Sequence, residues 1–186
     1  MKTLILNGSP RIGGDTERLL NVFRQKLEGE CKTVDAYRCG ISPCVDCRYC
    51  RENEGCAIDD EMQQVYRYIE ECDNVLIASP IYFSELTGKL LDVGSRFQMY
   101  FCAAFFRKAP IKIKPKKGGI ILVGGGDGAA DKGESTAKVL LHQINCFDIH
   151  PAVLSHNTNN LPAIEDENAV TGARRIAEFF NGKSAD

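Results

Sequence analysis

The sequence predicts an α/β fold in which helices cover both faces of a doubly wound parallel sheet. Short apolar runs at 2–6, 74–78 and 118–123 have the composition of strands buried on both faces. Turn residues follow each run, and segments with apolar residues at helical spacing separate the runs. This alternation is typical of parallel sheets with helices on both sides. We predict a single domain over residues 1–186, since a chain of this length can bury one large core.

The individual elements follow from their apolar spacing and from the residues at their ends. Thr16 can cap a first helix, whose apolar positions recur at helical spacing until Gly29. Asp59 and Asp60 favour the positive end of a second helix, and Gly94-Ser95 indicates a bend in a third. We predict strands at 2–6, 31–37, 74–78, 118–123 and 147–154, and later helices at 86–106, 134–145 and 164–180.

Five strands in this order suit the strand order 2-1-3-4-5 of the flavodoxin-like fold. Right-handed crossovers restrict the topology to a few doubly wound sheets. In this order the ligand crevice opens where the first and third strands diverge, outside their carboxyl ends. The two most turn-rich strand ends, after Leu6 and after Ser79, are therefore expected to lie side by side.

The composition excludes several classes of function. A net charge of -2 gives no basic surface for nucleic acid, and no apolar stretch is long enough to cross a bilayer. The apolar run near the amino terminus is too short for a signal peptide, so we expect a cytoplasmic protein. Nine cysteines in such a chain indicate reduced thiols, metal ligation or redox chemistry rather than a disulfide scaffold.

The segment after the first strand has the composition of an anion-binding loop. Its glycines can turn several backbone amides toward one point at the start of a helix, and Ser9, Arg11 and Thr16 add donors. Phosphate is the expected ligand, although Gly13-Gly14 would also suit an ordinary surface turn. The Lys and Ser or Thr of the Walker pattern are absent from this loop, which argues against a nucleotide triphosphatase. The glycines at 124–128 match the dinucleotide fingerprint only loosely, so we expect them to let the backbone approach a flat ring.

Three segments in the first half of the chain match a known family in their sequence and in their order. Asn7-Gly8-Ser9-Pro10-Arg11 with Gly14-Asp15-Thr16 resembles a phosphate loop, and Ser79-Pro80-Ile81-Tyr82-Phe83 resembles a flavin-ring loop. Between them, Cys56-Ala57-Ile58-Asp59-Asp60-Glu61-Met62 resembles the segment that follows the family's cysteines. The family is the NAD(P)H-dependent FMN reductase and iron-sulfur flavoprotein group of the flavodoxin-like superfamily. The second half of the chain is similar mainly in its pattern of strands and helices.

The resemblance implies FMN as cofactor, NAD(P)H as substrate and a set of FMN-binding residues. Two positions depart from the family. Asp15 stands where Asn is common, and a carboxylate beside a phosphate is unfavourable unless it faces helix amides. Ser95 stands where an Asp commonly precedes the arginine equivalent to Arg96, so an ion pair is expected to be missing. The implied contacts are Ser9, Arg11, Asp15 and Thr16 at the phosphate, Pro80, Ile81, Tyr82, Phe83 and Ser84 beside the ring, and Gly124, Gly125, Gly126 and Asp127 on its other side.

Four cysteines in an irregular segment at about 40–57 are the strongest metal-binding signal in the chain. Cys44, Cys47, Cys50 and Cys56 form the pattern C-x2-C-x2-C-x5-C, whose short gaps let the thiolates converge on one cluster. The resemblance implies a [4Fe-4S] cluster, and a tetrahedral zinc site and free thiols are alternatives. The three histidines lack metal-like spacing. We expect the other cysteines to be small buried residues: Cys31, Cys39, Cys72, Cys102 and Cys146.

Together these features predict an FMN-binding oxidoreductase that passes electrons from NAD(P)H to a small acceptor such as a quinone or free flavin. The alternative is an iron-sulfur flavoprotein that carries electrons between FMN, a cluster and partner redox proteins. A third is a redox-sensing or zinc module in which the cysteine segment is the working part. No side chain is assigned as catalytic, because hydride transfer to flavin requires no protein acid or base. The apolar segment 97–106 suits either packing within the chain or the interface of a homodimer or homotetramer.

Overall fold

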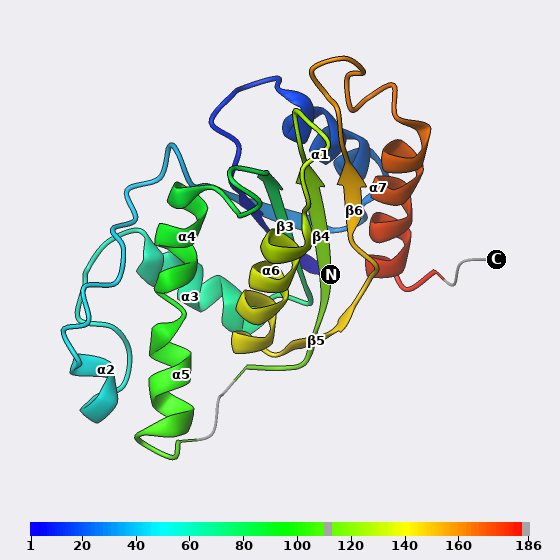
Figure 1. The fold of residues 1–186 in the computed structure, drawn as a ribbon. Coiled ribbons are helices and arrows are strands. Elements are labelled where there is room, and N and C mark those ends of the chain that lie inside the picture. The colour runs from blue at the N-terminus through cyan, green and yellow to red at the C-terminus, as the bar shows by residue number, and fades with distance from the viewer. Residues whose placement is uncertain (110–112, 184–186) are drawn as a thin grey trace.

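A parallel sheet forms the centre of the molecule (Figure 1). The computed structural model describes residues 1–109 and 113–183; residues 110–112 and 184–186, which belong to the predicted domain, lie outside the description. The strand order is β2-β1-β3-β4-β5, with β6 also paired to β4, and each pairing is parallel. The predicted order and direction are thus confirmed. The strands are β1 (Lys2–Asn7), β2 (Glu30–Asp35), β3 (Asn74–Pro80), β4 (Lys116–Val123), β5 (Cys146–Ile149) and β6 (Val153–Ser155).

The helices divide between the two faces of the sheet. Alternate residues of β1 point to opposite faces, so Leu4 and Leu6 enter one core and Ile5 enters the other. Helices α1 and α7 cover the face that holds Ile5, whereas α3, α4 and α6 cover the opposite face (Figure 1). The helices are α1 (Asp15–Lys26), α2 (Tyr49–Glu52), α3 (Met62–Glu71), α4 (Gly88–Ser95), α5 (Gln98–Phe105), α6 (Asp131–Gln143) and α7 (Glu167–Phe180).

The last predicted strand, 147–154, is two short strands, so the described part of the chain has six strands rather than five. Pro151 lies between β5 and β6, and it has no amide hydrogen to donate to the ladder. The two strands pair with successive halves of β4, and β6 is placed beside residues Ile121 to Val123. The carboxyl end of β6 therefore reaches the same edge of the sheet as the carboxyl end of β4.

The helix predicted at 86–106 is interrupted close to the expected bend. The amide of Arg96 donates to the carbonyl of Val93 at 3.1 Å, and that of Phe97 donates to Gly94 at 3.0 Å, so the chain tightens between α4 and α5. The carbonyl of Arg96 accepts hydrogen bonds from the Tyr66 hydroxyl at 2.8 Å and from the Met99 amide at 3.3 Å. This break sends α5 toward the short helix α2, which forms within the segment predicted to be irregular (Figure 1).

The arrangement separates two regions that hold the predicted site residues. The carboxyl ends of β1, β3, β4 and β6 meet at one edge of the sheet, whereas α2 and α5 lie together beyond the far end of α4 (Figure 1). Within the described residues, no helix combines the length and the apolar character needed to span a bilayer.

Candidate functional site

A cleft of about 340 Å³ opens at the carboxyl edge of the sheet, and its volume is in the range of small-molecule sites. Residues from the loops after β1, β3, β4 and β6 line it, as expected for a crevice at a topological switch point. The lining residues are Ser9, Pro10, Arg11, Gly14, Asp15, Thr16, Pro80, Ile81, Tyr82, Val123, Gly125, Thr158 and Asn159.

The loop after β1 is held by Asn7, a buried residue of the phosphate-loop segment for which the sequence predicted no role of its own. The side-chain amide of Asn7 donates to Asp35 at 2.6 Å, and its carbonyl oxygen accepts from the amide of Ser9 at 3.0 Å. The Ser9 hydroxyl in turn donates to the carbonyl of Arg11 at 3.1 Å. Asn7 thereby joins the end of β2 to the start of the loop. Together with the Ser9 hydroxyl, this connection holds the backbone of Arg11 in place.

The amino-terminal end of α1 has no side-chain cap and faces the cleft. Gly14 is the capping residue, so the first amides of this helix donate to no capping side chain. Among the described helices only α7 has a capping side chain, since the Asp166 carboxylate accepts from the amides of Asn168 and Ala169, each at 3.1 Å. The start of α1 is therefore distinguished by the cleft that it faces and not by the missing cap. An uncapped helix start bordered by Ser9 and Thr16 has the geometry and the dipole that bind phosphate.

The loops after β1 and β3 touch each other through a glycine. The Gly8 amide donates to the carbonyl of Ala78 at 2.8 Å, and the Gly8 carbonyl accepts from the Thr87 hydroxyl at 2.9 Å. A Cβ atom at Gly8 would lie 2.8 Å from the Thr87 hydroxyl oxygen and 3.0 Å from that of Ser79. Glycine is therefore required for the close approach that places the two loops side by side.

Asp15, a departure from the family pattern, has a partner away from the helix start. Its carboxylate accepts a hydrogen bond of 3.0 Å from the amide of Ala163, in the segment before α7. A carboxylate close to a phosphate would be repelled by it. This repulsion is weaker when one oxygen of the Asp15 carboxylate already accepts a hydrogen bond from another part of the chain. The partner is the amide of Ala163 and not the helix amides considered from the sequence.

The loop after β3 ends in a two-residue turn that exposes an aromatic ring. Phe83 and Ser84 have φ angles of 52° and 64°, and Tyr82 and Glu85 exchange backbone hydrogen bonds of 2.9 and 3.0 Å across them. The Tyr82 side chain lines the cleft, whereas Phe83 is fully exposed. Of the five ring-loop residues predicted, Pro80, Ile81 and Tyr82 line the cleft, and Phe83 and Ser84 do not.

The loop after β4 also contributes fewer residues to the cleft than predicted. Gly125 lines it, whereas Gly124, Gly126 and Asp127 do not. Thr158 and Asn159, which the sequence analysis missed, lie beside Gly125 because their amides donate to the carbonyls of Gly124 and Gly125 at 3.1 and 3.2 Å. The available signal was the end of the last predicted strand at residue 154, one residue before β6 ends, because the residues after it follow a carboxyl strand end as those after β1, β3 and β4 do.

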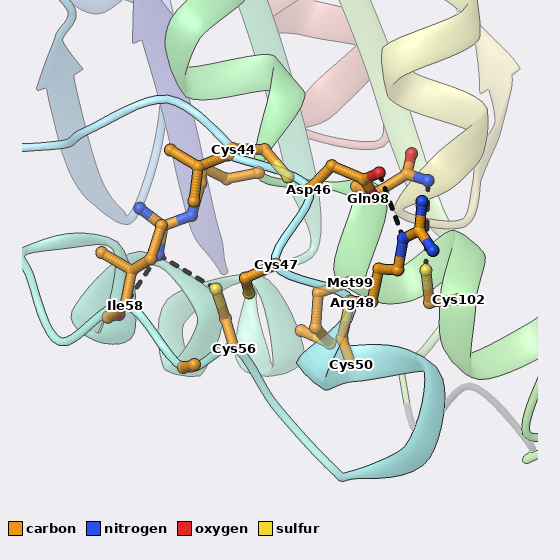
Figure 2. A pocket seen from close by; sticks show the side chains of 13 residues that line it. Cys44, Asp46, Cys47, Arg48, Cys50, Cys56, Ile58, Gln98, Met99 and Cys102 are labelled. Atoms are coloured by element: carbon orange, nitrogen blue, oxygen red, sulfur yellow. Dashed lines mark hydrogen bonds and ion pairs between the residues drawn. The ribbon is translucent and has the colours of Figure 1, made fainter.

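The four motif cysteines line a second, separate pocket (Figure 2). It encloses only about 20 Å³, enough for a single water molecule, and Cys102 from α5 also lines it. Across residues 1–109 and 113–183, no three His, Cys, Asp or Glu side chains are placed to hold a metal ion together. Four cysteine sulfurs are suitable in kind and number for an iron-sulfur cluster or a zinc ion. In the described residues, however, the cysteine loop closes around the small pocket and its sulfurs are not arranged around one metal position.

Arg96 fastens both ends of this cysteine loop to α4. Its side chain is fully buried and pairs with Asp60 at 2.7 Å, so the arginine retains an ion pair although Ser95 replaces the family's Asp. The guanidinium also donates to the Ser42 carbonyl at 2.9 Å and to the Cys56 sulfur at 3.4 Å. Ser95 has a role of its own, because its hydroxyl accepts from the Cys44 amide at 2.9 Å.

The Asp60 carboxylate is stabilised in its charged form. Burial alone would raise its pKa, but hydrogen bonds from Arg96 and from the amides of Ser42 and Met62 outweigh burial and hold the pKa below its ordinary value. The amide of Ser42 donates at 3.0 Å, as does that of Met62 at the start of α3. Asp60 therefore links the cysteine loop to α3 as well as to α4.

Among the cysteines outside the motif, three are buried as predicted and two are not. Cys72, Cys102 and Cys146 are buried, whereas Cys31 is exposed and Cys39 is half-buried. Cys31 lies in β2, the edge strand, where one side of the strand lacks a neighbour, which explains its exposure.

Comparisons with known proteins agree with this architecture. An NAD(P)H:quinone oxidoreductase structure from Methanothermobacter marburgensis has a TM-score of 0.72 at 17% identity, with 100% of this chain and 96% of that chain covered. The strand order and this likeness define a flavodoxin-like fold. The family model for NADPH-dependent FMN reductase matches residues 1–160, and the chain therefore belongs to that family.

The curated relatives add a second kind of similarity. An iron-sulfur flavoprotein of Methanocaldococcus jannaschii is 33% identical over 129 residues, which are 67% of this chain and 62% of that protein. An iron-sulfur flavoprotein of Methanosarcina thermophila is 29% identical over 128 residues, which are 67% of this chain and 64% of that protein. These matches thus span somewhat less than two thirds of the relatives' length.

Proposed function

We propose that the chain binds FMN in the cleft at the carboxyl edge of the sheet and acts as an NAD(P)H-dependent oxidoreductase. The observation that carries the proposal is the uncapped start of α1, which opens into a cleft that aromatic and glycine residues also line. Family membership supports the same cofactor and the same reductant. Bound flavin would supply the hydride and electron chemistry, with a small molecule such as a quinone or free flavin as acceptor.

The residues of the cleft divide into a charged end and a flat end. Arg11, Ser9, Thr16 and the first amides of α1 would hold the phosphate, because an arginine fork and helix amides both favour a dianion. Pro80, Ile81 and Tyr82 would border the isoalloxazine on one side, and Gly125 with Thr158 and Asn159 on another. Phe83, Ser84, Gly124, Gly126 and Asp127 are proposed to act only through the backbone shape of their loops.

The assembly and location remain part of the proposal. Phe101, Phe105 and Phe106 of the α5 region leave substantial apolar surface exposed, which suits a homodimer or homotetramer. We expect the protein to work in the cytoplasm, where its cysteines stay reduced.

Anaerobic reduction tests the proposed activity directly. Protein loaded with FMN should lose the absorbance of the oxidised flavin on addition of NADH or NADPH, and a quinone should restore it. Full reduction by dithionite with no reduction by either nicotinamide would show that the cleft binds flavin but that the chain is not an NAD(P)H-dependent enzyme.

A second candidate function is favoured by the four motif cysteines around one pocket and by the names of the curated relatives. In this candidate the chain is an iron-sulfur flavoprotein in which Cys44, Cys47, Cys50 and Cys56 hold a [4Fe-4S] cluster, and electrons pass between FMN, cluster and partner proteins. Iron, sulfide and zinc analysis of protein purified without oxygen decides it. Stoichiometric iron and sulfide would support this candidate, and zinc alone would indicate a tetrahedral zinc site. If the protein holds neither metal, the function is that of an FMN-dependent reductase without a cluster.

A further inference from the structure

A fifth cysteine, distant in sequence, enters the pocket of the motif cysteines. Cys102 belongs to α5, is buried, and lines the same pocket as the four thiols of the loop. In Figure 2 its side chain lies on the Cys50 side of the pocket and away from Cys56. The motif spacing gives no indication of this thiol, because about 50 residues separate it from Cys50.

The backbone around Cys50 is fastened to the two residues that follow α5, which come four and five positions after Cys102. The Arg107 guanidinium, just beyond the end of α5, donates to the carbonyl of Cys50 at 3.2 Å. The Arg51 guanidinium, next to Cys50 in α2, lies 4.6 Å from the centre of the Phe106 ring. These contacts place α2 against α5 independently of any bound metal, and they keep the two cysteines together.

The other motif thiols have different surroundings. Cys47 is exposed and stands between Asp46 and Arg48, whose φ angles of 46° and 65° define a tight turn. Cys56 accepts a hydrogen bond from Arg96 at the opposite end of the pocket. Cys50 is half-buried, and its carbonyl accepts a hydrogen bond from Arg107 just after α5. Cys102 is the thiol outside the motif that lines the pocket on this side (Figure 2).

We propose that Cys50 and Cys102 form a reversible disulfide that removes Cys50 from the four-cysteine motif. The oxidant is a low-molecular-weight disulfide. One protein thiolate attacks it and releases one small thiol, and the second protein thiolate then attacks the mixed disulfide and releases another. Two electrons pass from the protein dithiol to the small disulfide, and the two protons leave with the released thiols.

The linkage would have two consequences. It would join α2 to α5 covalently and close a long loop, which stabilises a fold by restricting the unfolded chain. It would also leave three motif cysteines, one fewer than a four-thiolate cluster or zinc site requires. The pair thus decides whether the pocket can accept a metal, and this inference does not depend on FMN binding.

Disulfide mapping tests the proposal on the full chain. Protein freed of metal with a chelator under anaerobic conditions is equilibrated with glutathione disulfide, its remaining thiols are alkylated, and its peptides are mapped without reduction. The expected product is a peptide pair linked through Cys50 and Cys102. It should be lost in Cys102→Ser and Cys102→Ala, in which Cys50 is recovered as a glutathione adduct.

Cys146→Ser is the matched control, because Cys146 is equally buried but lies in the sheet away from the pocket. This variant should form the Cys50–Cys102 linkage as the wild type does. In the second readout, oxidised wild-type protein should fail to take up iron and sulfide until it is reduced, and oxidised Cys146→Ser should behave in the same way. Linkages confined to the motif, or Cys102 recovered as an alkylated free thiol, would overturn the proposal.

Discussion

The cleft at the sheet edge and the cysteine pocket are built in different ways. In the cleft, parallel strands bring four loops together, and most of the bonds that shape it involve backbone groups such as those of Gly8, Ala78 and Gly125. In the cysteine pocket, side chains hold the loop in place, and Arg96 bonds to residues at both of its ends. The topology therefore dictates the first region, whereas the second depends on a few individual residues.

This difference predicts how each region responds to change. A cleft built by strand order should tolerate the loss of one side-chain contact and respond mainly to a change in backbone packing. A loop whose two ends are bound by one buried ion pair should lose order at both ends when either partner is removed, because a buried charge without a partner is costly.

Arg96→Met should have the largest effect. It leaves the Asp60 carboxylate, whose side chain is 11% exposed, without its buried partner, and we expect a loss of about 3–5 kcal/mol in the free energy of unfolding. Urea denaturation measures it. Asp60→Asn combined with Arg96→Met should recover part of the loss, because the unpaired charge is then removed.

Arg38→Met is the matched control for this prediction. Arg38 pairs with Asp35 at 3.3 Å, but both side chains are about one third exposed, and such pairs contribute only about 0–1 kcal/mol. Similar small losses for Arg38→Met and Arg96→Met would contradict the view that the cysteine loop depends on a single buried pair.

Gly8→Ala should have the next largest effect and should act on the cleft. The new methyl group would lie 2.9 Å from Leu90 as well as close to Thr87, so we expect about 1–3 kcal/mol of destabilisation and weaker FMN binding. Gly126→Ala is the control, since a Cβ atom there meets nothing within 4 Å. If flavin titration gave the same affinity for both variants, contact between the loops after β1 and β3 would not shape the cleft.

The smallest expected effect is a pH dependence of stability from Asp60. Because its folded-state pKa lies below the unfolded value of about 3.9, its contribution is complete above that value and is lost as the pH falls through the folded-state pKa. Wild-type protein should therefore lose more stability on acidification than Asp60→Asn. Unfolding curves at a series of acidic pH values measure the difference, and parallel pH profiles would show that Asp60 is not stabilised in its charged form.

The sequence predicted the cleft better than the pocket, and for a physical reason. Strand order follows from hydrophobic periodicity and crossover handedness, so the meeting of Ser9 with Tyr82 could be expected before any coordinates. Thr158 and Asn159 were missed because no glycine marks the loop that follows the last strand, although the end of that strand was predicted to within one residue. Cys102 was predicted only as a small buried residue, because local patterns indicate the bend at Gly94-Ser95 but not the segment against which α5 then packs.

The central claim is that the cleft, and not the cysteine pocket, binds FMN, and flavin fluorescence titration of two arginine variants tests it. Arg11→Ala should weaken FMN binding about 10- to 100-fold, which corresponds to a charged hydrogen bond of about 1.5–3 kcal/mol. Arg48→Ala, an exposed arginine of the cysteine pocket, should bind FMN as the wild type does. Unchanged affinity in Arg11→Ala together with a loss in Arg48→Ala would contradict the account.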